Sequence, residues 1–365
     1  MIKLKLKKMN RSYDKKLFIF VVLFTLLGVL LVLNVSGPEA IDKFSDRFYF
    51  AKQQLLWGVV GITLMLIVSK INYNFWKNYA VILYLFAVVL LVLVLIPGFG
   101  TRLLGAKRWL NLGPIGFQPS EFAKIALSIY LAKVASSQKR MISYLIPFII
   151  LVGLIMLQPD LGTVIIISAI VFSQIYIAGV DIRKMFLLLT AGILGGIGLI
   201  MSSAYRRARF ISFLNPLSDT LASSYHIKQI LYALGSGGIF GVGLGQSRQK
   251  YLFLPEATTD SIFAVIAEEV GFLGSIVLII FFVFFIRECL KIASNAPDKF
   301  SQVLAFGLSA WLAGQTLINL SSMVALTPLT GIPLPFISYG GSALISILVA
   351  CGILLNISRY INVEK

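Results

Sequence analysis

Long apolar runs separated by short polar connections are the feature that most constrains the fold of this chain. Eight of these runs are long enough to cross the ~30 Å hydrocarbon core of a bilayer. They cover approximately residues 17–36, 53–69, 79–97, 118–135, 185–203, 259–286, 300–326 and 338–357. Because 58% of the residues are hydrophobic and only 13% are charged, we predict a polytopic membrane protein rather than a soluble one.

A further apolar stretch, residues 141–180, is too long for one span. As a single helix it would measure ~60 Å, about twice the thickness of the hydrocarbon core. Gln158, Pro159 and Asp160 interrupt it, so we expect two spans here. The predicted fold is therefore all-α, with ten transmembrane helices in a single domain over residues 1–365 and both termini on one side of the membrane.

The distribution of Lys and Arg predicts the orientation of these spans. Eighteen lie in the termini and short connections on the side of the termini, and six lie in short connections on the other side. Positively charged connections stay in the cytoplasm, so we expect cytoplasmic N and C termini, with residues 1–16 as a basic N-terminal segment. This distribution explains most of the net charge of +17, and we expect no nucleic-acid partner.

Residues of about 204–258 form an unusually long connection between the seventh and eighth predicted spans. In the predicted orientation this connection is extracytoplasmic. It mixes aromatic, aliphatic and charged residues, which favours a loop folded on the membrane surface over a disordered tether.

The cysteine and histidine content limits cofactor chemistry. His226 is the only histidine, so a His-rich zinc or haem site is excluded. Cys289 and Cys351 fall near predicted cytoplasmic helix ends, where free thiols are expected. No dedicated metal site is evident, and the sequence leaves open whether a divalent cation takes part.

Four acidic residues lie inside or at the mouth of predicted spans: Glu121, Asp260, Glu268 and Glu269. An ionisable group is costly there and normally faces a polar cavity or a partner. Glu121 and Lys124 are three residues apart on one helix, so we expect them to pair, either to pack that helix or to line a substrate cavity. For Glu268 and Glu269 we favour a hydrogen-bonding role in the structure.

Asp260 follows the segment Leu254–Thr259 at the start of the eighth span. One interpretation is that it begins the helix as an N-terminal cap. The other is that its carboxylate, partly desolvated at the outer interface, acts as a general base.

The long connection also carries six cations that oppose the positive-inside trend: Arg206, Arg207, Arg209, Lys228, Arg248 and Lys250. The planar fork of arginine suits a phosphate or diphosphate, so a lipid-linked diphosphate is a fitting ligand. Adhesion to anionic lipid headgroups is the alternative.

Several motifs, taken together and in order, resemble the SEDS family, the FtsW, RodA and SpoVE group of peptidoglycan polymerases. They are Gly105–Trp109, Gln118–Glu121 with Lys124, Gln158–Thr163, Tyr205–Arg206 with Arg209 and Asn215–Pro216, Gly235–Gly238, Gln249–Lys250, Leu254–Asp260, Glu268–Glu269, Pro333–Pro335 and Ser338–Ser342.

This resemblance implies ten transmembrane helices and a processive glycosyltransferase that joins lipid II units outside the bacterial cytoplasmic membrane, releasing undecaprenyl diphosphate. It implies that Asp260 is the catalytic base and that Glu121 and Lys124 belong to the same cavity. The stretch Gly241–Lys250 is more similar to the division and sporulation branches than to the elongation branch, which favours FtsW and the division septum. Implied partners are a class B penicillin-binding transpeptidase and other divisome proteins.

The predicted site residues follow from both lines of argument. Asp260 is the predicted catalytic residue, and Glu121, Lys124, Arg206, Arg209 and Lys250 are predicted to bind substrate. The predicted supporting residues are Arg108, Gln118, Asp160, Gln229, Glu268, Glu269 and Ser338.

Two positions depart from the family pattern. Ser261 replaces a residue that is more often aromatic, and His226 replaces a common glutamine. These departures affect the expected pocket wall and acceptor contacts. Two other functions remain open from sequence: a flippase for lipid II and a non-catalytic scaffold that recruits a transpeptidase.

Overall fold

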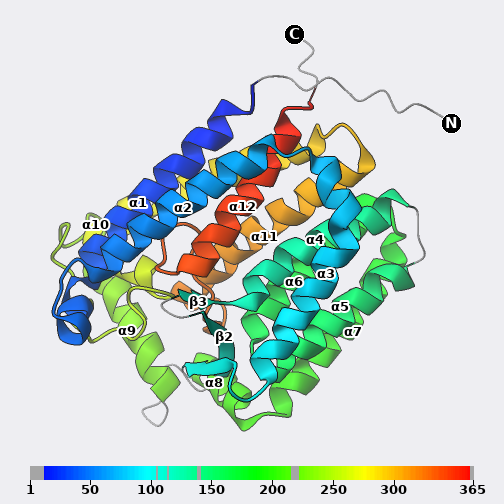
Figure 1. The fold of residues 1–365 in the computed structure, drawn as a ribbon. Coiled ribbons are helices and arrows are strands. Elements are labelled where there is room, and N and C mark those ends of the chain that lie inside the picture. Colours follow the sequence, from blue (N-terminus) through cyan, green and yellow to red (C-terminus); the bar gives the residue numbers. More distant parts are fainter. Residues whose placement is uncertain (1–11, 104–105, 113–114, 138–140, 215–221, 362–365) are drawn as a thin grey trace.

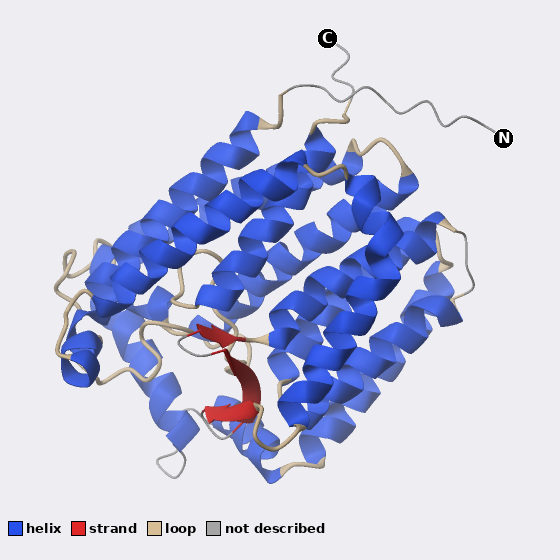
Figure 2. Cartoon of the chain, viewed as in Figure 1, coloured by secondary structure: helices blue, strands red, loops and turns tan. Residues whose placement is uncertain are grey.

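The computed structural model describes residues 12–103, 106–112, 115–137, 141–214 and 222–361, and this part of the chain is mainly helical (Figure 1, Figure 2). Its elements are α1 (Lys15–Phe44), α2 (Tyr49–Lys70), α3 (Tyr73–Leu95), β1 (Gly100–Leu103), β2 (Ala106–Leu112), β3 (Ile115–Phe117), α4 (Pro119–Ser136), α5 (Ile142–Leu157), α6 (Leu161–Ala178), α7 (Ile182–Met201), α8 (Ala204–Leu214), α9 (Ala222–Gly237), α10 (Ile262–Ser294), α11 (Lys299–Met323) and α12 (Gly341–Ser358).

The long helices run side by side in a bundle, and the start of α1 and the end of α12 lie at the same end of it (Figure 1). α2 packs along α12, while α11 contacts α4, α6 and α10. The backbone N–H of Asp14 donates to the hydroxyl of Ser358 at 3.0 Å. The start of α1 and the end of α12 therefore lie together, and the location of both termini on one side of the membrane stays a prediction.

In the described part of the chain, seven helices are long and apolar enough to cross a membrane: α1, α2, α3, α6, α10, α11 and α12. Two other predicted spans, α4 and α5, are not among them, since α4 carries Glu121, Lys124 and Lys133 and α5 has 16 residues. α7 is also outside the seven, but it exposes Phe186 and Leu187 at 71% and 72%, as a lipid-facing helix would. The protein is thus a membrane protein, and ten spans stay a prediction.

The predicted break within residues 141–180 is confirmed. α5 ends at Leu157 and α6 begins at Leu161. The carboxylate of Asp160 caps α6 by accepting hydrogen bonds from the backbone N–H of Thr163 at 3.1 Å and from its hydroxyl at 2.9 Å.

The all-α prediction is wrong for residues 100–117. They contain a three-stranded antiparallel sheet in the order β1-β2-β3, in which Leu110 lies opposite Gly100 on one side and Phe117 on the other. The strands are too short to show an extended alternation of apolar and polar residues, so no local pattern predicts them. The sheet lies at the end of the bundle away from the termini (Figure 2).

The long connection of residues 204–258 contains two helices, α8 and α9, so its described part is folded as predicted. On which side of the membrane it lies stays a prediction.

α10 is interrupted at Gly271, whose φ of 70° and ψ of −169° are not helical. Backbone groups that lose their partners within the helix at this break form hydrogen bonds with the connection after α9. The carbonyls of Glu268 and Glu269 accept from the N–H groups of Val242 and Gly243, both at 3.0 Å. On the other side of the break, N–H groups of residues 272 and 273 donate to carbonyls of residues 238 and 239, at 2.9 and 3.2 Å. The break is thus satisfied by main-chain contacts, as a low-dielectric environment requires.

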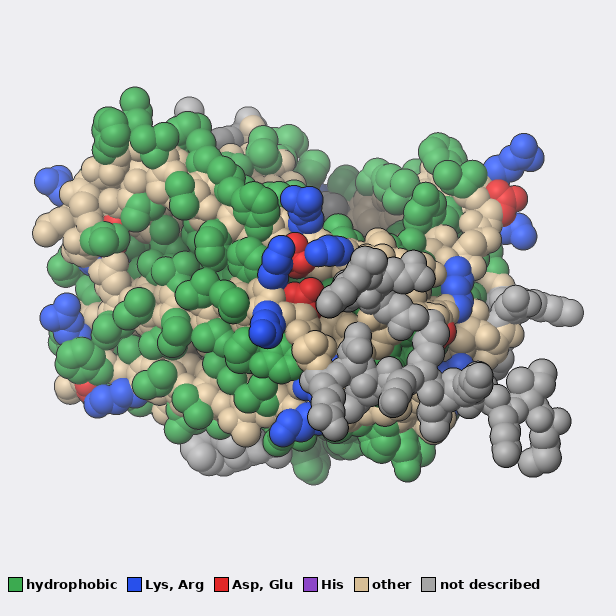
Figure 3. Space-filling view, turned by 90° about the horizontal axis from the view of Figure 1, so that it is seen from above, with side chains coloured by type: hydrophobic (Ala, Val, Ile, Leu, Met, Phe, Trp, Pro, Cys, Tyr) green, Lys and Arg blue, Asp and Glu red, His purple; other side chains and the backbone are tan. Residues whose placement is uncertain are grey.

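The face at the end of the bundle where α1 begins and α12 ends has Lys and Arg side chains near its centre, with Asp and Glu side chains among them, and further Lys and Arg side chains at its rim (Figure 3).

The break in α10 should not tolerate a side chain at Gly271. A Cβ atom there would lie 2.2 Å from the backbone nitrogen of Gly241, and the positive φ strains any L-residue. We expect Gly271→Ala to destabilise the folded protein by at least ~2 kcal/mol. Gly153→Ala on α5, where a Cβ meets open space, is the matched control and should change stability by less than about 1 kcal/mol. Thermal unfolding in detergent measures both; equal effects would contradict the assigned backbone constraint.

Candidate functional site

Asp260 lies in a turn that leads into α10. The helix begins at Ile262 and its N-terminal cap is Ser261, which makes no side-chain capping hydrogen bond. The interpretation of Asp260 as the helix cap is therefore wrong, because the turn continues one residue beyond it. The side chain of Asp260 is partly exposed, whereas Ser261 and the first turn of α10 are buried.

The backbone of this turn is fixed by residues distant in sequence. The carbonyl of Thr258 accepts from the backbone N–H of Tyr339 at 2.9 Å. The carbonyl of Thr259 accepts from the hydroxyl of Ser338 at 2.6 Å, and Ser338 is itself buried. The structure thus places Ser338, a predicted supporting residue, against the main chain that leads to Asp260.

A third contact reaches Asp260 itself. The side-chain amide of Asn319, on α11, donates to the carbonyl of Asp260 and to the carbonyl of Ile332, both at 2.8 Å. Next to Ile332, Gly331 has a φ of +73°, and a Cβ atom there would lie 3.3 Å from Oδ2 of Asp260. The segment around Gly331 therefore lies directly against the Asp260 carboxylate.

Glu121 and Lys124 form the predicted ion pair. Nζ of Lys124 lies 2.8 Å from Oε1 of Glu121, and both side chains are almost fully buried. Nζ of Lys124 is also 3.3 Å from Oε1 of Gln315 and 4.6 Å from the ring centroid of Trp311. Pairing and aromatic contact compensate the buried charge.

Gln315 connects this ion pair to the segment beside Asp260. Its Oε1 accepts from Lys124, and its Nε2 donates to the carbonyl of Pro333 at 2.9 Å. Gln315 and Asn319 are four residues apart on α11, so both lie on the same helix face. Neither was predicted, although two buried amides at this spacing in an apolar span are a signal that would have found them.

Arg108 and Asp160 both stabilise the connection between α5 and α6. Nε of Arg108, on β2, donates to the carbonyl of Gln158 at 3.1 Å, and Nη2 donates to the carbonyl of Pro159 at 2.6 Å. Nη1 of Arg108 lies 4.0 Å from the carboxylate of Asp160. The start of α6 packs against the segment beside Asp260, because a Cβ atom on Gly162 would lie 2.8 Å from the side chain of Ile332.

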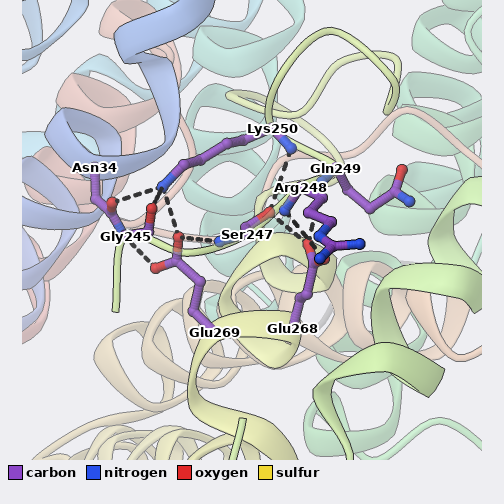
Figure 4. Close-up of polar contacts among 8 residues, drawn as sticks. All are labelled: Asn34, Gly245, Ser247, Arg248, Gln249, Lys250, Glu268 and Glu269. Carbon is purple, nitrogen blue, oxygen red and sulfur yellow. Dashed lines mark hydrogen bonds and ion pairs between the residues drawn. The ribbon is translucent and has the colours of Figure 1, made fainter. Parts of the chain in front are cut away.

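Lys250 belongs to a buried cluster with Glu269 (Figure 4). Nζ of Lys250 lies 2.8 Å from Oε1 of Glu269, 2.7 Å from the carbonyl of Gly245 and 3.2 Å from Oδ1 of Asn34. An ammonium group has three N–H donors, and these three acceptors use them. In this arrangement Lys250 orders its own loop, and it would have to leave Glu269 to bind a diphosphate.

Glu268 lies beside that cluster and orders the same loop (Figure 4). Its carboxylate accepts from the hydroxyl of Ser247 and from the backbone N–H groups of Arg248 and Gln249, the latter two at 3.2 and 3.4 Å. The structural hydrogen-bonding role expected for Glu268 and Glu269 is confirmed.

The remaining predicted residues lie on α8, on α9 and directly before α4. Arg206 and Arg209 lie on α8, but their side chains are outside the part of the structure that is described. Gln118, directly before α4, and Gln229, on α9, are partly buried. His226, on α9, has Nε2 2.7 Å from the hydroxyl of Ser261, so the two departures from the family pattern contact each other.

Comparison with known proteins identifies the family. The sequence matches the FtsW/RodA/SpoVE family, described as cell cycle proteins, over residues 14–363. The chain belongs to this family. The resemblance seen in the sequence motifs is thereby confirmed.

Two relatives with established names match almost the whole chain. Stage V sporulation protein E of Bacillus subtilis (strain 168) is 41% identical over 357 residues, covering 96% of this chain and 98% of that protein. The probable peptidoglycan glycosyltransferase FtsW of Trichlorobacter lovleyi is 40% identical over 358 residues, covering 95% of this chain and 93% of that protein.

Solved structures share the fold. A chain from a peptidoglycan synthase complex, solved to show structural coordination of polymerization and crosslinking, has a TM-score of 0.79 at 27% identity and covers 96% of this chain and 98% of its own length. The rod shape determining protein RodA of Thermus thermophilus has a TM-score of 0.71 at 26% identity, covering 96% of this chain and 97% of its own length.

The buried pair of Glu121 and Lys124 should respond differently to single and double substitution. Lys124→Met leaves a buried carboxylate without its cation, and we expect a loss of about 3–5 kcal/mol of stability. Glu121→Gln together with Lys124→Met removes both charges and should recover much of this loss. Lys52→Met, which removes the exposed partner of Asp46, is the control and should have little effect. Unfolding in detergent measures all three; a stable Lys124→Met protein would contradict the assigned coupling.

Proposed function

We propose that this family member is a peptidoglycan glycosyltransferase that polymerises lipid II at the outer face of the cytoplasmic membrane, with Asp260 as the general base. The observation that carries the proposal is a partly exposed carboxylate on a turn whose main chain is held by three consecutive carbonyl hydrogen bonds. A base on so firmly held a turn can keep a fixed distance to a bound hydroxyl group. Support also comes from relatives named as probable peptidoglycan glycosyltransferases.

The proposed reaction is a displacement at the anomeric carbon of the donor sugar. The acceptor hydroxyl oxygen forms the new bond to this carbon, and Asp260 takes the hydroxyl proton. The bond between the anomeric carbon and the phosphate oxygen breaks, and its electron pair leaves with undecaprenyl diphosphate. Because the attack is a single displacement, the anomeric configuration inverts. A diphosphate leaves as an anion, so it needs cations more than a protonating acid.

Arg206 and Arg209 are proposed to bind this diphosphate. Both lie on α8, within the connection that leads to the Asp260 turn, and an arginine fork matches phosphate oxygens. Lys250 contributes indirectly in this proposal, since its contacts with Glu269 and Gly245 order the loop before Asp260. Glu121 and Lys124 also contribute indirectly in this proposal. Lys124 donates to Gln315, which donates to the carbonyl of Pro333 in the segment beside Asp260.

Among the residues that the structure describes, no group of three or more His, Cys, Asp or Glu side chains is placed to hold a metal ion.

We further propose a crosslinking partner, a class B penicillin-binding transpeptidase. The support is the structural relative from a complex that couples polymerization with crosslinking. A place at the division septum with other divisome proteins is proposed because relatives at 40–41% identity are FtsW and a sporulation protein, whereas the RodA structure is 26% identical.

Replacement of Asp260 by Asn tests the proposed base. Asn is nearly the same size but does not accept a proton, so lipid II polymerisation in detergent should fall by a factor on the order of 10² or more. Asp181→Asn is the matched control, because it also removes one carboxylate, at a position directly before α7 where Oδ1 accepts from the N–H of Arg183 at 2.9 Å. Normal glycan synthesis by a folded Asp260→Asn protein would refute the mechanism and revive the flippase or scaffold function.

The proposed orientation predicts which residues an outside reagent reaches. Leu244 is 73% exposed in the connection after α9, and Ser137 is exposed at the opposite end of the bundle. In a background without Cys289 and Cys351, an impermeant thiol reagent should label Leu244→Cys and not Ser137→Cys in intact cells. The reverse pattern would invert the topology.

A further inference from the structure

The side chain of Asn319 joins two segments that are far apart in sequence. Its amide nitrogen donates to the carbonyl of Asp260, 59 positions away, and to the carbonyl of Ile332, 13 positions away. Asn319 is 1% exposed; its hydrogen bond to Ile332 is buried, and its hydrogen bond to Asp260 is part-buried. Buried hydrogen bonds of this kind are costly to lose, because each carbonyl would remain unpaired in an apolar environment.

The two acceptors determine which way the amide points. An NH₂ group has two donors, and the two carbonyl oxygens use both of them. The opposite orientation would place the amide oxygen against two other oxygens, so the assignment of the nitrogen follows from the contacts. The oxygen Oδ1 of Asn319 has no hydrogen-bond partner among the described residues. The contacts of this side chain are therefore made by its donor group.

These hydrogen bonds act on the part of Asp260 that determines where its carboxylate lies. A shift of the Asp260 main chain moves the attached carboxylate with it. The second acceptor, Ile332, follows Gly331, which lies against Oδ2 of Asp260. Asn319 thus fixes both the main chain that carries the carboxylate and the segment that borders it.

Gln315, one helical turn earlier on α11, extends this arrangement to the buried ion pair. It donates to the carbonyl of Pro333 at 2.9 Å and accepts from Lys124 at 3.3 Å. Its Oε1 also accepts from the indole N–H of Trp311 at 2.7 Å, which holds the amide in place. Two neighbouring carbonyls, of Ile332 and Pro333, are therefore held by two amides on one face of α11.

We propose that Asn319 is a positioning residue for Asp260: its amide holds the main chain of the proposed base and the adjacent Gly331–Pro333 segment in the reactive geometry, and Gln315 connects that segment to the pair of Glu121 and Lys124. This inference rests on the proposed function of Asp260. Asn319 itself does not touch the reacting groups in this proposal.

Asn319→Asp is the principal test. Asp has nearly the same size as Asn, but it has at most one hydrogen-bond donor, and that only when protonated, so at least one of the two carbonyls loses its partner. Displacement of a catalytic group by about 1 Å can cost 10²-fold in rate. We expect kcat for lipid II polymerisation in detergent to fall at least tenfold while KM stays within about twofold, because an interaction needed in the transition state is lost rather than substrate binding.

Asn356→Asp is the matched control. Asn356 is fully buried on α12 and donates to the carbonyl of Ser69 at 2.9 Å. This control introduces the same chemical change far from the Asp260 turn. The stability of the Asn356→Asp protein should fall as that of Asn319→Asp does. Its kcat per folded molecule should stay at the wild-type value.

A second variant keeps the test decisive if Asn319→Asp fails to insert into the membrane. Asn319→Ser adds no charge but shortens the side chain, so at most one of the two carbonyls can be reached. We expect an intermediate kcat, between wild type and Asn319→Asp, or a clear decrease where only the Ser variant folds. Wild-type kcat in a folded Asn319→Ser or Asn319→Asp protein would overturn the proposal, as would an equal fall in kcat for Asn356→Asp.

The outcome for Asp260→Asn separates this inference from the proposed function. If Asp260→Asn remains active, the proposed base is wrong, and the positioning role of Asn319 is rejected with it. If Asp260→Asn is inactive while the Asn319 variants keep their kcat, only the positioning role is rejected.

Discussion

The arrangement of the site depends on the break in α10 at Gly271. A helix in an apolar environment can be interrupted only where other groups bond to the N–H and C=O groups that it releases. Here the connection after α9 supplies these groups, because Gly241 and Gly271 let two backbones approach within contact. The same connection continues to Lys250 and then to the Asp260 turn. A main-chain contact in the middle of α10 therefore determines the course of the segment that presents the proposed base.

Two buried ion pairs support this turn from different sides. Glu269 with Lys250 orders the loop that precedes the turn, and Glu121 with Lys124 reaches the segment beside it through Gln315. Buried pairs contribute little net stability, since desolvation offsets most of their attraction, but they disfavour any arrangement in which the charges separate. Here the two pairs favour one arrangement of the loop before the turn and of the segment beside it. A catalytic carboxylate benefits from one defined arrangement, because its rate advantage depends on distance and orientation to the substrate.

The sequence predicted the parts of this structure that carry a strong local signal. Long apolar runs located the helices, the Gln158–Asp160 interruption separated α5 from α6, and the spacing of Glu121 and Lys124 predicted their pairing. The short strands of residues 100–117 have no comparable periodicity and were missed. Lys250 shows a different limit. Its charge predicted an anionic partner, but only the fold reveals that Glu269, 19 positions away, provides one.

Asn319 and Gln315 illustrate why the remaining contacts were not predictable from local pattern. A buried amide in an apolar helix signals a polar partner, yet its acceptors are backbone carbonyls, which every residue carries. No residue type therefore marks Ile332 or Pro333 as the partner. The contact also explains how the partly exposed Asp260 is held: hydrogen bonds to its own carbonyl and to the two carbonyls before it fix the main chain. Rigidity at the proposed base is thus supplied through backbone carbonyls, and no pattern of residue types along the chain reveals such contacts.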